Sequence, residues 1–147
     1  MQKAILFLCL FQFSFTQILF SQFTSEKVLT IYGENSGDSF GPPPSSAGDI
    51  NGDGVDDIIL GANYNDSGGV DAGRAYIFWG SSTISGNISA SNADIIITGE
   101  NSGDFFGVIS EAGDINGDGI DDVVIGGYNN DSGGSEAGRA YIFWGST

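Results

Sequence analysis

Short runs of β-branched and aromatic residues, separated by glycine, asparagine and serine, make up the chain from Val28 onward. Such runs are typical of β-strands bounded by turns. Ser81–Asn92 is rich in serine, asparagine and glycine, and we expect it to be a loop. No segment has helical periodicity, so the pattern predicts an all-β fold. We expect strands at Val28–Tyr32, Ser45–Ala47, Asp57–Gly61, Ala75–Trp79, Ile95–Thr98, Val108–Ala112, Asp122–Gly126 and Ala140–Trp144.

The strands belong to an internal repeat. The segment from Gly33 to Ser81 returns as Gly99 to Ser146, with about two-thirds of the aligned positions identical. Each unit offers four strands, the fourth being Val28–Tyr32 or its counterpart Ile95–Thr98. Repeated four-stranded antiparallel sheets are the blades of a β-propeller. Pro42 to Pro44 interrupt the first strand of the first unit, which weakens that strand or moves it to a sheet edge.

An acidic loop stands at the centre of each unit. Asp49–Asp57 reads Asp-Ile-Asn-Gly-Asp-Gly-Val-Asp-Asp, and Asp114–Asp122 differs from it only at position 7. Oxygen-bearing side chains occupy positions 1, 3, 5 and 9, with a glycine at position 6 for the turn. Hard cations such as Ca²⁺ prefer oxygen ligands, and position 7 can add its backbone carbonyl. Asp56 and Asp121, at position 8, are expected to face solvent.

Two other kinds of loop share part of this pattern, the EF-hand and the metal-free turn. An EF-hand would carry glutamate at position 12 and lie between helices, whereas Leu60 and Ile125 stand there and strand-like runs follow. The loops could also be turns without metal, because Asp, Asn and Gly are ordinary turn residues. Four carboxylates within nine residues, repeated twice, favour a cation because uncompensated like charges repel.

The composition of the chain indicates in which compartment it is found and which partners are disfavoured. Residues 1–22 have a basic residue, Lys3, near their start and continue as an apolar run. This pattern is typical of a secretory signal peptide, an uncleaved anchor being the alternative. Cys9 lies in this segment, so the mature chain would have no cysteine for a disulfide.

The 147 residues carry 19 acids and 4 bases, a formal charge of −15, which disfavours nucleic acid as a partner. Arg74 and Arg139 are expected to pair with nearby carboxylates such as Asp71 and Glu136.

The linked motifs resemble the FG-GAP repeat, the blade of the integrin α-subunit propeller. They are Phe40-Gly41 and Phe106-Gly107, the acidic loops from Gly48 and Gly113, and the Gly73–Gly80 and Gly138–Gly145 runs. Both units lack the family's proline after the second strand. The resemblance implies a propeller of seven blades with Ca²⁺ in the loops. The implied ligands are Asp49, Asn51, Asp53, Asp57 and the Val55 carbonyl in one unit, and Asp114, Asn116, Asp118, Asp122 and the Ile120 carbonyl in the other.

The domain organisation that follows is a signal peptide over 1–22, a lead-in strand over 23–32, and blades over 33–98 and 99–147. Two blades make an incomplete propeller, so we expect a fragment of a longer chain or self-association of copies.

We expect a secreted or cell-surface Ca²⁺-binding module for adhesion or recognition of an extracellular protein or glycan, without enzyme activity. The alternatives are the accessory propeller of an extracellular phospholipase or polysaccharide-degrading enzyme, or a purely structural repeat. Asn65, Asn87 and Asn130 begin Asn-x-Ser sequons, which are glycosylation sites if the source is eukaryotic.

Overall fold

The computed structural model describes residues 28–147, and the expected signal peptide over 1–22 lies outside these residues. The described chain consists of nine strands and one short 3-10 helix, η2 (Ala90–Asn92). Within residues 28–147 there is no helix long and apolar enough to cross a membrane. The predicted all-β fold class is therefore confirmed.

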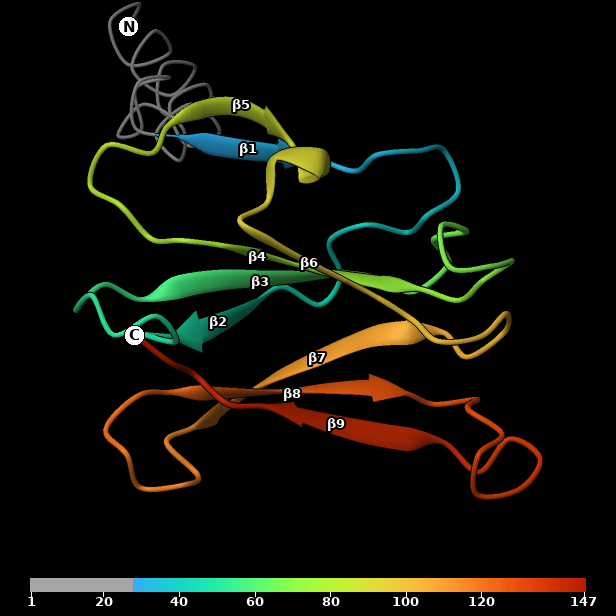
Figure 1. The fold of residues 1–147 in the computed structure, drawn as a ribbon. Helices are drawn as coiled ribbons and strands as arrows, with labels where there is room; N and C mark the ends of the chain where they lie inside the picture. Colours follow the sequence, from blue (N-terminus) through green and yellow to red (C-terminus); the bar gives the residue numbers. More distant parts are fainter. Residues whose placement is uncertain (1–27) are drawn as a thin grey trace, which may run out of the picture.

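Two antiparallel sheets lie one above the other as layers (Figure 1). The first sheet, called the first blade, has the strand order β2-β3-β4-β6, and the second blade has the order β7-β8-β9. The ends of these seven strands lie within two residues of the ends expected from the sequence. The bounds are β2 Ser45–Gly48, β3 Asp57–Ala62, β4 Arg74–Phe78, β6 Ile95–Thr98, β7 Phe106–Gly113, β8 Asp122–Gly127 and β9 Arg139–Phe143.

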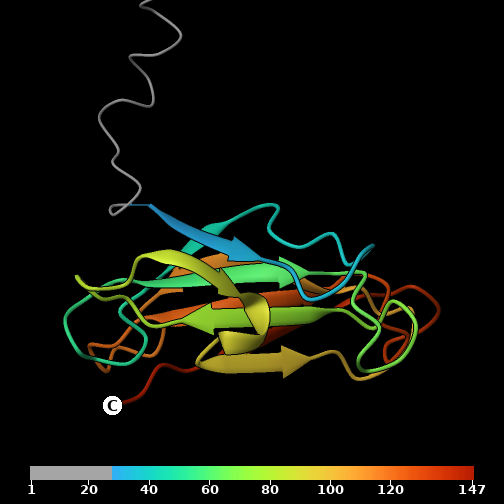
Figure 2. The same cartoon turned by 90° about the horizontal axis from the view of Figure 1, so that it is seen from above.

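The expectation that Ser81–Asn92 is a loop is wrong in its second half. β5 (Gly86–Ser89) lies there and pairs in parallel with β1 (Leu29–Tyr32), followed by η2. This two-stranded ribbon lies across the outer side of the first blade (Figure 2). Val28–Tyr32 and Ile95–Thr98 therefore have different surroundings, because β6 joins the first blade while β1 joins no antiparallel sheet.

The three prolines shorten a strand without abolishing it. β2 has four residues and lies at the edge of its sheet, whereas its counterpart β7 has eight. A proline has no N–H to donate to a neighbouring strand, which explains why pairing starts only at Ser45. This outcome agrees with the sequence-based expectation.

The main core lies between the two blades. Ile59, Ala75 and Ile77 of the first blade are nearly inaccessible and pack with Val123 and Ile125 of the second. A second cluster under the β1–β5 ribbon contains Leu60, Tyr76 and Phe78. The aromatic runs are thus packing residues in the first blade, as expected. Successive side chains of a strand point to opposite faces, so each inner strand serves both clusters.

Backbone contacts also join the two blades. The loop after β6 donates from the N–H groups of Gly103, Phe105 and Phe106 to carbonyls of the β3–β4 connection, at 2.8–3.0 Å. Close approach is possible because glycines line the contact. A Cβ built on Gly61 would lie 1.9 Å from the Gly107 carbonyl oxygen, and one on Gly48 would lie 2.1 Å from an Asp121 carboxylate oxygen.

Candidate metal-binding loops

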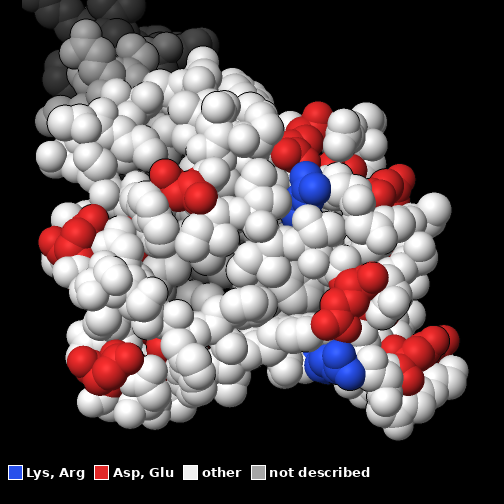
Figure 3. Space-filling model, viewed as in Figure 1, with Lys and Arg blue, Asp and Glu red and all other residues white. Residues whose placement is uncertain are grey.

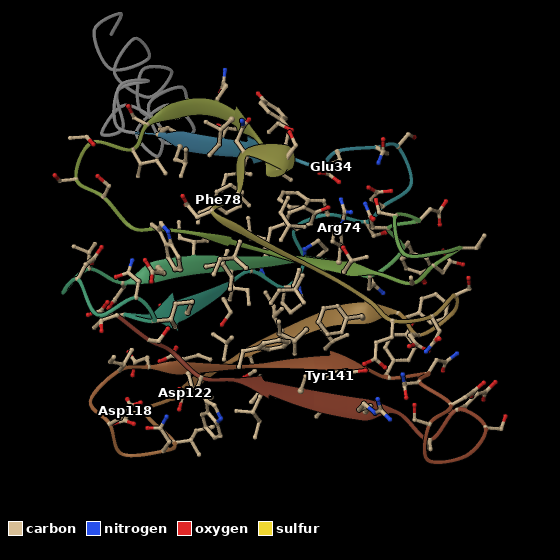
Figure 4. All side chains as sticks on the ribbon, viewed as in Figure 1. Glu34, Arg74, Phe78, Asp118, Asp122 and Tyr141 are labelled. Carbon is tan, nitrogen blue, oxygen red and sulfur yellow. The ribbon has the colours of Figure 1, made fainter. Side chains whose placement is uncertain are left out.

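The two acidic loops connect the first and second strands of each blade and lie at the same end of the two sheets. Figure 4 shows Asp118 and Asp122 at this end, with Arg74 and Glu34 at the other. Gly54 and Gly119, at position 6, have φ of 87° and 90°, a conformation that side-chain-bearing residues rarely adopt. The turn predicted at position 6 is therefore present in both loops.

Positions 1, 3 and 5 are drawn together by backbone N–H groups. In the first loop, the Asp53 N–H donates to Asp49 Oδ1 at 3.0 Å and to Asn51 Oδ1 at 2.9 Å. Val55 N–H donates to Asp53 Oδ1 at 2.9 Å. The same bonds recur around Asp114, Asn116 and Asp118. The oxygens of positions 1 and 3 thus converge on one N–H in each loop.

Position 9 has a different arrangement. Asp57 is 1% exposed, and its two oxygens accept from the N–H groups of Ile50 at 3.1 Å and Gly80 at 2.8 Å. Asp122 likewise accepts from Ile115 and Gly145, each at 2.9 Å. This carboxylate therefore fastens the start of its loop to the residues that follow the third strand.

Burial raises the pKa of Asp57 above its ordinary value, opposed by the hydrogen bonds from Gly80 and Ile50. The nearby Asp53 and Asp49 raise this pKa further. A bound cation would act in the opposite direction, because an adjacent positive charge favours the ionised carboxylate.

The donor set fits a hard cation in its chemistry. Carboxylate, amide and carbonyl oxygens are the ligands of Ca²⁺, and a carboxylate has about four lone-pair positions, so a hydrogen bond does not exhaust it. Among residues 28–147, however, no three carboxylate, imidazole or thiol groups already converge on one point. Positions 1, 3 and 5 would hold the ion. The oxygens of all four positions now accept from backbone N–H groups, and position 9 differs from the other three in being buried.

Position 8 differs between the loops. Asp56 is exposed, as expected, but the expectation of a solvent-facing Asp121 is wrong. Asp121 is half-buried and its Oδ2 accepts from the Asp49 N–H of the first loop at 3.0 Å. The missing Cβ of Gly48 makes room for this carboxylate. Position 8 of one blade therefore links to the loop of the preceding blade.

A polar cluster that the sequence analysis missed lies at the opposite end of each blade. Asn65 is 0% exposed, and its Nδ2 donates to Asp38 Oδ2 at 2.7 Å. Asn130 and Asp104 repeat this bond at 2.7 Å in the second blade. Since Asn65 and Asn130 are buried and bonded, only Asn87 of the three sequons is exposed. The repeated Gly-Glu-Asn-Ser-Gly-Asp segments were the available signal.

The two arginines pair with partners other than those expected. Arg74 contacts Glu34 at 2.8 Å and Arg139 contacts Glu100 at 3.0 Å, instead of Asp71 and Glu136. Figure 3 shows both arginines with acidic groups beside them. In the first blade the Glu34 carboxylate also accepts from the Tyr76 hydroxyl at 3.1 Å. Burial and this hydrogen bond raise the pKa of Tyr76 well above its usual range.

Three aromatic side chains gather at the same end. The rings of Phe105 and Tyr128 are stacked with centroids 5.1 Å apart, and Tyr64 meets Phe105 edge-on at 5.3 Å. Tyr64 and Tyr128 are 43% and 49% exposed. Phe105 has a φ of 50°, which a bulky residue rarely adopts. Nothing in the spacing of these residues along the chain predicts that they meet.

The family model of the FG-GAP repeat matches residues 45–78 and 106–143. These segments run from the first to the third strand of each blade and contain both acidic loops. The chain is a member of the FG-GAP repeat family.

Two integrin α subunits are similar to this FG-GAP protein. Integrin alpha-PS2 of Drosophila melanogaster is 33% identical over 140 residues, 88% of this chain. Integrin alpha-5 of Xenopus laevis is 34% identical over 104 residues, 67% of this chain. The chain spans 9% of the length of each of these relatives. The suspected relation to integrin α-like blades is therefore confirmed.

Proposed function

We propose that this protein is a non-catalytic, Ca²⁺-binding propeller module that is secreted or displayed at the cell surface and recognises an extracellular protein or glycan. The observation that carries the cation part is the repeated loop geometry. In both blades a left-handed glycine follows three oxygen-bearing positions. The side chains of positions 1 and 3 accept from the N–H of position 5, and the side chain of position 5 accepts from the N–H of position 7. Asp49, Asn51, Asp53, Asp57 and the Val55 carbonyl would hold one ion, and their counterparts in the second blade would hold another.

Recognition of a partner would use the end of the blades opposite to the cation loops. Tyr64, Phe105 and Tyr128 present partly exposed rings there. Aromatic side chains with exposed hydroxyl groups are common at interfaces because they combine apolar area with a polar end. The similarity to integrin α subunits supports an extracellular role of this kind.

The test of the cation part is a calorimetric titration of the full chain with Ca²⁺. We expect two sites with dissociation constants of about 10⁻⁴–10⁻³ M, the range of extracellular modules. Asp53→Ala should remove one site, and Asp53→Ala with Asp118→Ala should remove both. Asp56→Ala is the matched control, since its exposed side chain lies outside the proposed ligand set and should leave both sites. Mg²⁺ should bind more weakly because it demands a smaller, near-octahedral site.

Absence of Ca²⁺ binding, or binding unchanged in the double variant, would refute the loop assignment. The recognition part is tested separately, by protein and glycan arrays probed with the parent chain and with Tyr128→Ala. Loss of array signal in Tyr128→Ala with an unchanged Ca²⁺ titration would support the aromatic surface. Equal signals from the two proteins would contradict it.

A further inference from the structure

The first residue of the first acidic loop is held by the second loop as well as by its own. Within its own loop, the two carboxylate oxygens of Asp49 accept from the N–H groups of Asp53 at 3.0 Å and Gly54 at 2.8 Å. On the other side, the Asp49 N–H donates to Asp121 Oδ2 at 3.0 Å, and the Asp49 carbonyl accepts from the Asp121 N–H at 3.2 Å. Asp49, the proposed ligand at position 1, is therefore fixed from both sides.

Asp121 lies in sequence between two proposed ligands of the other site. It follows Ile120, whose carbonyl is the ligand at position 7, and precedes Asp122, the buried carboxylate at position 9. The side chain of Asp121 is nevertheless directed to the neighbouring loop, because its Oδ2 bonds to Asp49. Asp121 thus belongs to one loop in sequence and contacts the ligand of another.

This contact between the loops is closely fitted. Gly48 is buried, and a Cβ built on it would lie 2.1 Å from Asp121 Oδ2 and 2.6 Å from Asp121 Cγ. Asp121 is half-buried, which removes part of its carboxylate from water. Hydrogen bonds to an ionised acceptor are stronger than those between neutral groups, and a lower local dielectric strengthens them further. The bond therefore restrains Asp49 more than a contact in open solvent would.

The equivalent residue of the first loop has different surroundings. Asp56 also stands at position 8, after a β-branched residue and before the buried Asp57, but it is exposed. The chain therefore contains two aspartates at equivalent positions, one bonded to a neighbouring loop and one facing solvent. A comparison of the two separates the effect of the bond from the effect of the charge.

We infer that Asp121 is a positioning residue for cation binding at the first loop, although it belongs to the second loop. This inference rests on the Ca²⁺ sites proposed above. Asp121 fixes the peptide group of Asp49, so the Asp49 carboxylate already lies beside the Asn51 oxygen at the Asp53 N–H before an ion binds. A ligand that is ordered beforehand loses less conformational freedom on binding, and this increases the affinity.

The test uses the full chain with one loop inactivated, so that each site is measured alone. Asp118→Ala leaves the first-loop site, and Asp53→Ala leaves the second-loop site. The dissociation constant comes from the rise of the melting temperature with Ca²⁺ concentration, which stays measurable for weak binding. Adding Asp121→Ala should weaken the first-loop site roughly ten-fold, as expected for a lost hydrogen bond to a charged group. The second-loop site, which contains residue 121, should change by less than about two-fold.

Three further variants separate positioning from charge. Asp121→Asn keeps an oxygen for the Asp49 N–H without the charge, and it should restore most of the affinity lost in Asp121→Ala. Asp56→Ala removes a charge from the first loop itself and should weaken its site by less than about two-fold. Gly48→Ala should reproduce the loss, because its methyl group displaces Asp121. Gly113→Ala is its matched control, since the two glycines have φ of 69° and 65° but a Cβ on Gly113 meets nothing within 4 Å.

A measurement without metal checks the contact itself. In Ca²⁺-free solution, the Asp49 amide hydrogen should exchange faster in Asp121→Ala than in the parent, and Asp121→Asn should restore its protection. Equal exchange in the parent and Asp121→Ala, or an unchanged first-loop affinity in Asp121→Ala, would overturn the inference. An equal loss of affinity in Asp56→Ala would also overturn it, because charge alone would then account for the effect. If the parent chain did not respond to Ca²⁺ at all, the proposed cation sites would be refuted, and the positioning role with them.

Discussion

At the scale of single residues, the side-chain amides of Asn65 and Asn130 organise the end of each blade opposite to the acidic loops. Asn65 bonds to Asp38 through Nδ2, and its Oδ1 accepts from the Ser67 N–H at 3.0 Å. Both Asn65 and Asp38 are almost inaccessible to water. Asp38 Oδ2 also accepts from Asn35 Nδ2, at the longer distance of 3.3 Å. A buried carboxylate that loses its shorter hydrogen bond is compensated less for its lost hydration, so the Asn65 amide contributes to stability.

Asn65→Ala is therefore expected to lower the free energy of unfolding by about 1–3 kcal/mol, because Asp38 and the Ser67 N–H lose a partner. Asn130→Ala should have a similar effect in the second blade. Asn87→Ala, at the exposed sequon, should change stability by less than about 0.5 kcal/mol. Urea denaturation at low protein concentration measures all three, and equal stabilities for Asn65→Ala and Asn87→Ala would contradict the role assigned to this amide.

The buried hydroxyl of Tyr76 should make the stability of the protein depend on pH in the alkaline range. Its pKa is raised in the folded chain by burial and by the bond to Glu34. A group with a raised folded pKa contributes stability below its unfolded pKa of about 10, and that stability is lost as the pH rises further. The free energy of unfolding should thus fall as the pH rises above about 10, through this residue. Tyr76→Phe should remove that component of the fall; parallel pH profiles for the two proteins would contradict the assignment.

At the scale of elements, strands of the two blades approach each other closely only where one of them has a glycine at the contact. Gly61 lies inside β3, and any side chain there would point at the Gly107 carbonyl of β7. Gly126 is the equivalent residue of β8 and has no such neighbour. The repeat thus provides two glycines in equivalent strands with opposite surroundings.

Gly61→Ala should destabilise the protein by about 1–3 kcal/mol or more, because the two blades must separate to admit the methyl group. Gly126→Ala should be neutral or stabilising by about 0.4–1 kcal/mol, through reduced freedom of the unfolded chain. Thermal and urea unfolding of the two variants, at concentrations where the protein is monomeric, compare the sites directly. If Gly61→Ala proved as stable as the parent, the distance between the blades would have to be larger than described.

Most of the elements could be predicted from the sequence because the repeat presents each strand twice. β3 and β8 support each other, and the apolar runs of both are bounded by acidic loops and glycines. β5 was missed because Gly86-Asn87-Ile88-Ser89 has a single large apolar residue. Its strand conformation depends on pairing with β1, more than 50 residues earlier in the chain, as the pairing of Ile31 with Ile88 requires. Local pattern contains no information about such a partner.

The candidate loops were predictable in composition but not in detail. Glycine at position 6 could be expected because the turn requires it. The orientation of Asp57 could not, because its partner Gly80 lies beyond β4 and is brought back only by sheet formation. The link between Asp121 and the Asp49 N–H depends on how the two blades stack, which no single loop encodes. Ligand sets taken from sequence alone therefore treat position 9 as equivalent to positions 1, 3 and 5, which it is not.

At the scale of the whole molecule, the distribution of charge opposes folding. The chain has a formal charge of −15, and both arginines of residues 28–147 are already paired with glutamates. Eight of the 19 acids lie in two loops at one end of the sheets. Repulsion between them is relieved most effectively by a cation bound among them, and only partly by the diffuse atmosphere of a salt.

Ca²⁺ at ten times its dissociation constant should therefore add about 1.4 kcal/mol of stability per site and raise the melting temperature. Sodium chloride at equal ionic strength should give a smaller rise, because it only screens. Differential scanning calorimetry with EDTA, NaCl, Mg²⁺ and Ca²⁺ separates these contributions. The same rise with all three salts would mean that charge screening alone accounts for the effect.

The glycine recess at Gly61 has a consequence for how such proteins lengthen. The two faces of a blade differ, because one has a recess at glycine and the other presents the backbone that fits into such a recess. Neighbouring blades therefore pack with unlike faces in contact, all in the same orientation. Each further blade covers one recessed face and brings another, so a row of packed blades always has one recessed face uncovered. No face is left uncovered only when the first blade packs on the last in a closed ring. A side chain larger than glycine at this position would keep the next blade from packing at the present distance.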